Sequence, residues 1–332
     1  MNLNQIITKY GDVLVMSASS FLQRENSVLN TNIPLYIYSV LDTQKCFDKI
    51  KNIFGECQTS YEDNTILAVP NTDFTQKDRF SFADLVEIIF RLRDPDGCMW
   101  DRAQNNMTIR TNAVEEAYEL VEAVELNDNV KICEESGDVL LQGVFNAIIA
   151  EQENRFSLND MITNLCIKLV TRHTHIFGKD KAYSKEDALV FWEKAKSTEK
   201  EQKSVNDKLN AVPATFSALL KANKVQKIIK KTGFDFPSVE EAVKKIYEEI
   251  DEFLQEDADQ EKEGGDLLFS VVNVLRMLDI DPEIALMGTT NRFIRRFEYV
   301  VKKATEQNKK VEELSLDEME SYYQEYKKIE NN

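Results

Sequence analysis

The sequence predicts a mainly α-helical protein that begins with a small α/β segment. Three observations predict this class. Residues 1 to about 80 contain two strand-like runs, PLYIYSV and TILAVP, around a helix-like run, TQKCFDKIKNIFG. Beyond Ser81 the apolar residues recur with the helical period of about 3.6. The 332 residues include only 10 glycines and 6 prolines, which disfavours an all-β fold dense in turns.

Helix starts follow one another along the rest of the chain. Capping boxes of the form S/T-x-x-D/E mark them at Ser81/Asp84, Ser157/Asp160, Ser184/Asp187, Ser238/Glu241 and Ser315/Glu318. A charged, apolar-poor stretch at residues 197–210, followed by Pro213, separates two helical blocks. We therefore expect an α/β segment at 1–80, a first helical module at 81–203 and a second at 210–330.

The composition disfavours several partners and locations. With 58 acidic and 41 basic residues, the net charge of -17 repels nucleic-acid polymers and anionic membranes. Five cysteines without a CxxC pair support neither disulfides nor a zinc site. The first residues lack a basic leader, and the most apolar stretch, 139–150, is broken by Gln142 and Asn146. We expect a cytoplasmic protein that does not span a membrane.

The two helical blocks repeat each other. EEAYELVEAV precedes EESGDVLLQGVFN in the first, and EEIDEFL precedes EGGDLLFSVVN in the second. The offset is 133 residues for the first element and 128 for the second. Matched residues also flank both copies: Gly97, Trp100 and Asp101 against Gly233, Phe236 and Pro237 upstream, and Lys168 and Arg172 against Arg292 and Arg296 downstream. Two diverged copies of one helical module follow one another.

Carboxylates gather in each copy. Glu115, Glu116 and Glu119 share one helix face, as do Glu135 and Asp138 on the next helix. The intervening NDN is turn chemistry, so the two helices are expected to be antiparallel neighbours. At about 1.5 Å of rise per residue, the two acidic groups come nearly level. The sequence therefore predicts that the two acidic clusters face each other.

The apolar neighbours indicate where this face points. We expect the acids to border the core, because the apolar residues that flank them are Ala117, Leu120, Val121, Val124, Val139, Leu140 and Val144. Like charges about 4 Å apart repel by roughly 4 kcal/mol at an effective dielectric constant of 20, so such a cluster stays ionised only with cations. Oxygen ligands favour Mg²⁺ or Mn²⁺. The alternative is that these acids form an ordinary solvated helix face. A di-iron site is disfavoured, because such sites use a Glu-x-x-His motif and neither His173 nor His175 has a glutamate three residues before it.

Further motifs carry a resemblance to a known family. LRDPDGCMWD and RHTHIFG flank the first acidic pair, and KANKVQKIIKKTGFDFP and NRFIRRF flank the second. Over residues 81 to about 305 the chain resembles tandem MazG nucleoside triphosphate pyrophosphohydrolases. The resemblance implies two all-α modules of four-helix-bundle type and a homodimer. It also implies cleavage of a nucleoside triphosphate between its α- and β-phosphates, giving a monophosphate and pyrophosphate with Mg²⁺.

The resemblance assigns roles to individual residues. It implies metal ligands at Glu116, Glu119, Glu135 and Asp138 in the first module and at Glu249, Glu252, Glu263 and Asp266 in the second. Glu115 and Glu248 are candidate water-orienting bases, with a surface or ligand role left open. It implies substrate contacts at Lys168, Arg172, Lys224, Lys227, Asn291, Arg295 and Arg296. Trp100 and Phe236 are candidates for stacking on the nucleobase, with core packing as the alternative.

The chain also departs from the family pattern. The spacing from Glu252 to Glu263 is five residues shorter than that from Glu119 to Glu135, and Lys262 and Gly264 interrupt an EELGD-like run. The second site is therefore expected to differ in geometry. Thr171 stands where the family tends to have a basic residue, which weakens the expected phosphate grip of the first module.

Residues 33–74 resemble the tail of a tetrapyrrole methylase domain, with an unrelated α/β cap as the alternative. Only Gly11 and Gly55 occur in the first 80 residues, too few for the glycine-rich turns of a methyltransferase, so we expect no methylation. For the whole chain we expect a Mg²⁺-dependent nucleoside triphosphate pyrophosphohydrolase in nucleotide pool sanitation or stress-nucleotide control. The alternative is a nucleotide-binding or scaffolding dimer in which one or both modules have lost turnover.

Overall fold

The computed structural model describes residues 3–10, 13–23, 33–71, 73–199, 204–255 and 259–330. The chain divides into two compact units, residues 1–171 and 172–332, and each is described by itself. Helices dominate both units, which confirms the mainly α-helical fold class. The module bounds at residues 203 and 210 rest on the charged stretch of the sequence at 197–210 and stay a prediction.

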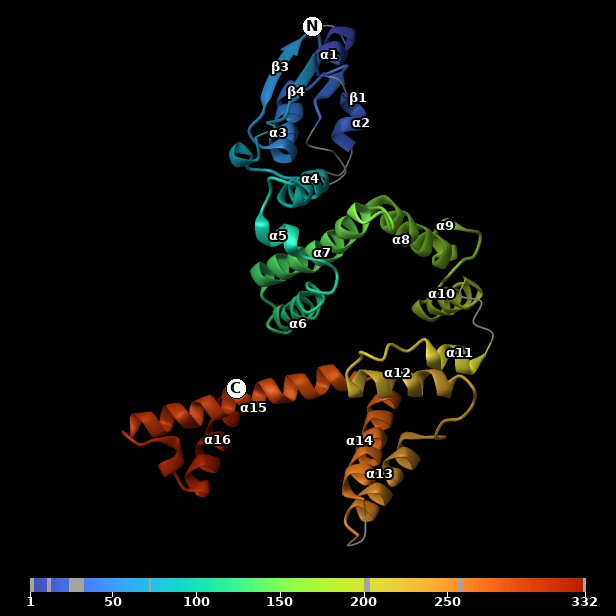
Figure 1. Ribbon diagram of the computed structural model, residues 1–332, viewed down its shortest axis with the longest axis vertical. Coiled ribbons are helices and arrows are strands. Elements are labelled where there is room, and N and C mark those ends of the chain that lie inside the picture. Colours follow the sequence, from blue (N-terminus) through green and yellow to red (C-terminus); the bar gives the residue numbers. More distant parts are fainter. Residues whose placement is uncertain are drawn as a thin grey trace. The chain divides into compact units, whose positions relative to one another are not determined.

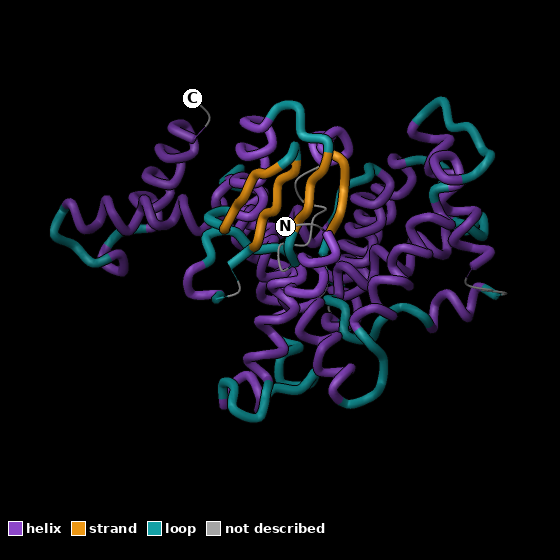
Figure 2. Tube along the Cα trace, turned by 90° about the horizontal axis from the view of Figure 1, so that it is seen from above, coloured by secondary structure: helices purple, strands orange, loops and turns teal. Residues whose placement is uncertain are grey.

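The first unit begins with a small α/β sheet. Its elements are α1 (Leu3–Tyr10), β1 (Leu14–Ser17), α2 (Ala18–Gln23), β2 (Leu35–Tyr38), α3 (Thr43–Phe54), β3 (Gln58–Glu62) and β4 (Thr65–Val69). The strand order is β1-β2-β4-β3, with β1 parallel to β2 and the other neighbours antiparallel. Figure 2 shows the four strands side by side. The expected strands and helix near residues 34–40, 43–55 and 65–70 are confirmed as β2, α3 and β4.

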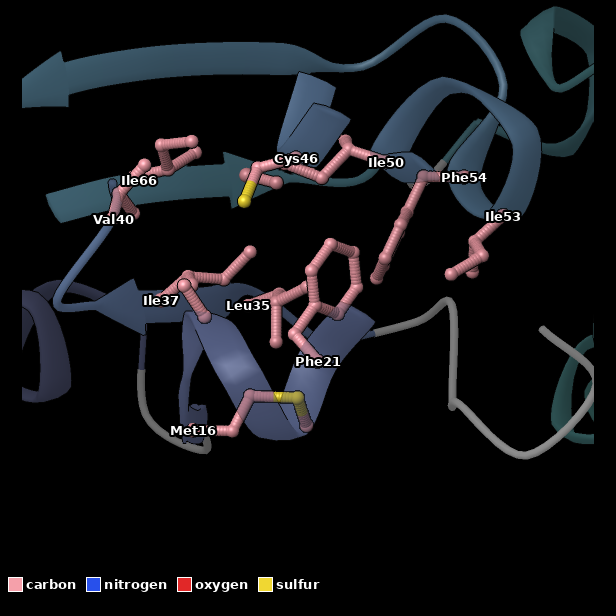
Figure 3. Packing of buried hydrophobic residues seen from close by; sticks show 12 residues of the cluster. Met16, Phe21, Leu35, Ile37, Val40, Cys46, Ile50, Ile53, Phe54 and Ile66 are labelled. Carbon is pink, nitrogen blue, oxygen red and sulfur yellow. The ribbon is translucent and has the colours of Figure 1, made fainter. Parts of the chain in front are cut away.

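This sheet has its own apolar core. Alternate residues of β2 and β4 point inward, where Leu35, Ile37 and Ile66 are fully buried. They pack with Phe21 of α2 and with the inner face of α3, which includes Ile50 (Figure 3). Because this core is continuous between the sheet and two helices, the α/β segment is a packed structure and not a loose leader.

Two strands of the sheet were not predicted from the sequence. β1 is only four residues long, and β3 carries the exposed polar run QTSYE, so neither shows the alternating apolar pattern of a half-buried strand. β3 forms because a tight turn joins it to β4. Asp63 and Asn64 take positive φ values of 48° and 56°, the conformation of a two-residue hairpin loop.

A short 3-10 turn, η2 (Phe74–Gln76), connects the sheet to the helical part of the first unit. α4 (Phe82–Arg93) starts with the predicted capping box, in which Ser81 and Asp84 bond each other's backbone amides. Asp84 is fully buried and pairs with the Lys77 ammonium. The buried ion pair therefore fixes the start of α4 against the segment before it.

The remaining helices of this unit are α5 (Met99–Ala103), α6 (Asn112–Glu125), α7 (Asn129–Gln152) and α8 (Leu158–Arg172). α6 packs against one part of the longer α7, and a very short turn joins the two helices (Figure 1). Asn127 takes a positive φ of 53°, and the Asp128 side chain accepts the first free amides of α7. The predicted NDN turn between two neighbouring helices is confirmed.

The core of this helical part lies at the far half of α7. Ile148, Val144 and Ile149 are buried there against Ile89 of α4 and Leu158 of α8. The expectation that the acids on α6 and α7 border the core is confirmed only in part. Val144 is buried and Leu120 and Val121 are half-buried. The other flanking residues are exposed, and they are Ala117, Val124, Val139 and Leu140.

The second unit is helical throughout its described residues. Its elements are α9 (Thr174–Phe177), α10 (Lys185–Glu199), α11 (Val205–Asn210), α12 (Ala218–Lys230), α13 (Val239–Phe253), α14 (Gln260–Met277), α15 (Pro282–Glu306), η3 (Val311–Glu313) and α16 (Leu316–Glu330). α13 and α14 lie side by side, as α6 and α7 do in the first unit (Figure 1). α12 packs across α14, and α16 packs along α15.

The predicted helix starts fall where the structure has them, with some differences in detail. The boxes at Ser157/Asp160 and Ser315/Glu318 are reciprocal, like the one at α4. At Ser184 and Ser238 the serine caps the helix, but Asp187 accepts from Tyr183 and Glu241 pairs with Lys244, so these two boxes are half formed. α11 was not predicted, although Ser204 and Asp207 form a full box there. No described helix is both long and apolar enough to cross a bilayer.

Candidate metal and nucleotide site

The first carboxylate cluster lies where α6 meets α7. Carboxylate oxygens of Glu116, Glu135 and Asp138 all lie within 4.8 Å of one another. The three side chains are half-buried. The tight turn at Asn127 sets this arrangement, because it brings the two helices together with their acidic positions level. The predicted facing of the two acidic groups is therefore present in the structure.

Burial and mutual repulsion both raise the pKa values of carboxyls in this cluster. Burial raises the pKa of Glu116 above its usual 4.5, and the charges of Asp138 and Glu119 raise it further. Burial also raises the pKa of Glu135, followed by the charges of Glu119 and Glu134. Ionised oxygens this close, with raised pKa values, form a site that a divalent cation would stabilise.

The second cluster repeats this arrangement on α13 and α14. Oxygens of Glu249, Glu263 and Asp266 lie within 4.8 Å of one another. Glu249 is only 5% exposed, and its Oε2 atom has no hydrogen-bond partner among the described residues. The Oε2 atom of Glu263 also has no hydrogen-bond partner among the described residues. A buried carboxylate oxygen without a donor is costly, so both atoms fit a role as ligands for a hard cation.

Two lysines enter the second cluster. The Lys245 Nζ atom lies 2.6 Å from Glu248 Oε1 and 2.7 Å from Glu249 Oε1. Hydrogen bonds to these two carboxylates raise the pKa of Lys245. Lys245 precedes Glu249 by four residues on α13, so the helix itself places the ammonium over that carboxylate.

Lys262 enters the cluster from the first turn of α14. Its Nζ atom lies 2.7 Å from Glu263 Oε1 and 3.5 Å from Asp266 Oδ2. The hydrogen bond to Glu263 is the main cause that raises the pKa of Lys262. One oxygen of Glu263 is thus held by an ammonium group, while the other has no donor.

A cavity of about 760 Å³ opens beside the second cluster. Its walls combine charged groups with aromatic rings, and α12, α13, α14 and the loop at residues 232–237 all contribute to them. Among the lining residues are Lys245, Glu249, Asp266, Phe236, Phe269 and Arg276. This size and mixture suit a small-molecule ligand that carries both an apolar ring system and negative charge.

Buried polar contacts fix the wall of this cavity. The Arg276 guanidinium pairs with Asp235 and donates to Asn273 Oδ1 from Nε at 2.9 Å. Gly233 turns the chain after α12 with a φ of 88°, a conformation that glycine adopts without strain. Gln226 donates from Nε2 to the Phe269 carbonyl at 2.9 Å, which ties α12 to α14. The loop that carries Phe236 is therefore held rigidly.

Not every predicted ligand lies in a cluster. Glu119 and Glu252 fall outside the two groups of three, although the charge of Glu119 acts on both Glu116 and Glu135. The candidate bases differ in setting. Glu115 is exposed, and Glu248 is held by Lys245.

The predicted substrate contacts are scattered. Phe236 lines the cavity, whereas Trp100 on α5 is 62% exposed. Arg172 is buried, with its guanidinium 5.5 Å from the Trp192 ring, and Lys168 is half-buried on α8. The remaining predicted contacts, which do not line this cavity, are Lys224, Lys227, Asn291, Arg295 and Arg296.

The two C-terminal arginines have partners of their own. The Arg296 Nη2 atom lies 2.7 Å from Glu330 Oε2, and the Arg295 Nη2 atom lies 3.6 Å from Glu330 Oε1. Both contacts join α15 to α16. In the described chain these guanidinium groups therefore hold the C-terminal helix in place.

Several residues of the cavity wall were missed from the sequence. Lys245 could have been found, because it lies four residues before Glu249 on the acidic helix face. Arg276, Asp235 and Gln226 carry no such local signal. Their roles depend on contacts between α14, α12 and the loop after it, and helical periodicity does not encode these contacts.

Comparison with known proteins settles the family. The MazG nucleotide pyrophosphohydrolase domain matches residues 104–177, the segment that contains the first carboxylate cluster. The nucleoside triphosphate pyrophosphohydrolase/pyrophosphatase MazG of Thermotoga maritima is 37% identical over 248 residues, which are 74% of this chain and 95% of that protein. The chain belongs to the MazG nucleotide pyrophosphohydrolase family.

A second relative agrees with this assignment. The nucleoside triphosphate pyrophosphohydrolase of Escherichia coli K12 is 37% identical over 254 residues, which are 74% of this chain and 97% of that protein. Among solved structures, a mazG-related protein from Thermotoga maritima is similar, with 29% identity, a TM-score of 0.31, and coverage of 34% of this chain and 96% of that chain. The resemblance to the family is confirmed, and membership identifies the chain as a hydrolase.

Proposed function

We propose that this MazG-family chain hydrolyses nucleoside triphosphates to monophosphates and pyrophosphate in a reaction that depends on Mg²⁺. The observation that carries the proposal is the second cluster. Glu249 and Asp266 line a cavity of nucleotide size together with an ammonium group and an aromatic ring. The names of the relatives from Thermotoga maritima and Escherichia coli support the same activity. A role in nucleotide pool sanitation or stress-nucleotide control is part of the proposal.

The donor atoms fit Mg²⁺ or, as an alternative, Mn²⁺. Each cluster offers three carboxylates and neither histidine nor cysteine, which is the ligand set that hard divalent cations prefer. The unpartnered Oε2 atoms of Glu249 and Glu263 supply two of the oxygens. When bound, the cation would neutralise the triphosphate charge and lower the pKa of an attacking water.

The protein groups around the second cluster divide the remaining work. Lys245 lines the cavity, so its ammonium is placed to donate to a phosphate oxygen beside Glu249. Phe236 offers a ring face in the same cavity for the nucleobase. Glu248, which Lys245 holds, is the candidate that orients the attacking water, and Glu115 is its counterpart on α6.

A panel of nucleoside triphosphates, assayed for monophosphate and pyrophosphate with Mg²⁺, tests this proposal. We expect Asp138→Asn and Asp266→Asn, made separately, to lower the rate by about 100-fold or more in whichever module turns over, because each removes a charged cation ligand. Glu122→Gln, an exposed position on α6 outside the cluster, is the matched control.

The rival function is a nucleotide-binding or scaffolding dimer without turnover. One observation favours this rival function for the second module. The ammonium groups of Lys245 and Lys262 already neutralise part of the negative charge of the second cluster. A protein that binds Mg²⁺ but releases no pyrophosphate from any common or damaged nucleoside triphosphate would refute the catalytic proposal. In that case both aspartate variants keep the oligomeric state.

We propose a homodimer as the working form. Large apolar side chains are exposed on several helices, and contiguous exposed apolar patches mark interaction surfaces. On α15 the exposed residues Phe293, Phe297 and Val301 recur every four residues and form a stripe. The other exposed large apolar side chains of this helix are Ile284, Leu286 and Ile294. A second copy of the chain, with the same stripe, is the simplest partner for such a face.

A further inference from the structure

The two carboxylate clusters differ in charge although their ligands match. At the matched offsets, Lys245 stands where the first module has Asn112, and Lys262 stands where it has Glu134. We compare seven matched positions, which in the first module carry one asparagine and six carboxylates: Asn112, Glu115, Glu116, Glu119, Glu134, Glu135 and Asp138. Their counterparts in the second module are Lys245, Glu248, Glu249, Glu252, Lys262, Glu263 and Asp266. In the second they carry five carboxylates and two ammonium groups.

Of the two lysines, Lys262 is the one that has no place in the cavity and no favourable position in its helix. Lys245 lines the cavity and is positioned for substrate phosphate. Lys262 does not line it, yet its ammonium lies 2.7 Å from Glu263 and 3.5 Å from Asp266, two of the three clustered carboxylates. Its side chain is 65% exposed and sits in the first turn of α14, where the positive end of the helix dipole favours an acid instead.

A lysine in this position competes with a divalent cation. It already holds Glu263 Oε1, so only Oε2 of that carboxylate is without a partner. Even when a cation displaces the ammonium, the positive charge stays on the same helix turn, within the screening distance of about 8 Å at physiological salt. Cation affinity at carboxylate sites follows the ligand charge count, so the added positive charge weakens binding.

We propose that Lys262 acts as a tethered counter-ion that lowers the divalent-cation affinity of the second cluster, so that the two clusters of one chain load at different magnesium concentrations. The inference rests on the proposed metal-binding role of both clusters. Glu134, at the matched position, adds a carboxylate beside the first cluster where the second has an ammonium group, which makes the first cluster the tighter site.

Manganese binding, followed by electron paramagnetic resonance of free Mn²⁺ on the full chain, tests the proposal without any turnover. We expect two classes of sites in the wild-type protein. Asp138→Asn should remove the tight class and Asp266→Asn the weak one. Lys262→Glu should tighten the weak class by about ten-fold, and Glu134→Lys should loosen the tight class by a similar factor.

Both exchanged positions are exposed. Lys302→Glu, at an exposed position on α15, makes the same change of charge away from the clusters and serves as the control. It should leave the Mn²⁺ affinities of both classes of sites within two-fold of wild type. A single class of sites in the wild-type chain, or Lys262→Glu affinities within two-fold of wild type, would overturn the inference. Absence of bound Mn²⁺ at both clusters would instead overturn the metal-dependent function itself. Circular dichroism of each variant identifies any loss of fold, and Lys262→Gln, which should give half the effect on a logarithmic scale, checks the charge dependence.

Discussion

Glu116 shows how a single side chain depends on what occupies the first cluster. Its pKa is raised by burial and then by Asp138 and Glu119. A carboxyl whose pKa is higher in the folded state costs stability when it is ionised. This cost is complete above the folded-state pKa and disappears as the pH falls through the usual value of 4.5. The apo protein therefore has an electrostatic strain that either protons or cations relieve.

We predict that Glu116→Gln raises the melting temperature at pH 7 without divalent cations by about 1 to 2 °C, because it removes one of the repelling charges. The difference from wild type should vanish as the pH falls to about 4.5. With Mg²⁺ the order should reverse, since the variant lacks a ligand. Scanning calorimetry from pH 4 to 8, with and without Mg²⁺, measures all three effects, and a Glu122→Gln protein should show none of them.

At this scale the sequence was informative where the chemistry is local. Helical spacing was enough to place Glu116, Glu135 and Asp138 together, because both helices are regular and the turn between them is short. Spacing is enough to place Lys245 beside Glu249, but it indicates neither that Lys245 lines the cavity nor that Arg296 pairs with Glu330. The first depends on which side of α13 the cavity opens, and the second on a contact between α15 and α16, neither of which has a sequence period.

At the scale of elements, α14 carries a weakness that has no packing reason. Gly265 lies in the interior of the helix, and a Cβ atom built there would meet nothing within 4 Å. Glycine costs a helix interior up to about 1 kcal/mol relative to alanine. Gly265 thus leaves α14 less stable than its fold requires.

We predict that Gly265→Ala increases the free energy of unfolding of the second unit by about 0.5 to 1 kcal/mol, measured by urea titration. Gly97→Ala is the informative contrast. A Cβ atom at that position would collide with the backbone carbonyl of Leu92, so this variant should lower stability. Equal effects of the two changes would show that helix propensity does not limit α14.

Prediction of the elements succeeded where burial gives a periodic pattern. β2 and β4 alternate, and α6, α7 and α13 show acidic and apolar faces, so their residues reveal them. β3 is exposed along its length and exists through its pairing with β4, which no composition signal announces. α11 is six residues long and lies inside a stretch with little apolar content, so only its capping box marks it.

At the scale of the whole molecule, the exposed apolar face of α15 is the feature that a homodimer explains. We predict that Ile294→Asp, at a position that is 49% exposed, shifts the chain from dimer to monomer and weakens association by about ten-fold or more. Sedimentation velocity over a range of concentrations measures this. Lys302→Asp, also exposed on α15, should keep the wild-type distribution, and a monomeric wild-type chain would contradict the prediction.

The turn at Asn127 has a consequence for how such a chain can change over time. Two residues, Leu126 and Asn127, separate the end of α6 from the Asp128 cap. An α-helix advances about 100° with each residue, so an insertion that α7 absorbed would swing Glu135 and Asp138 off the face that Glu116 occupies. The length of this connection therefore matters as much as its residues. A single codon whose extra residue is taken up by α7 before Glu135 would separate the carboxylates without altering any of them.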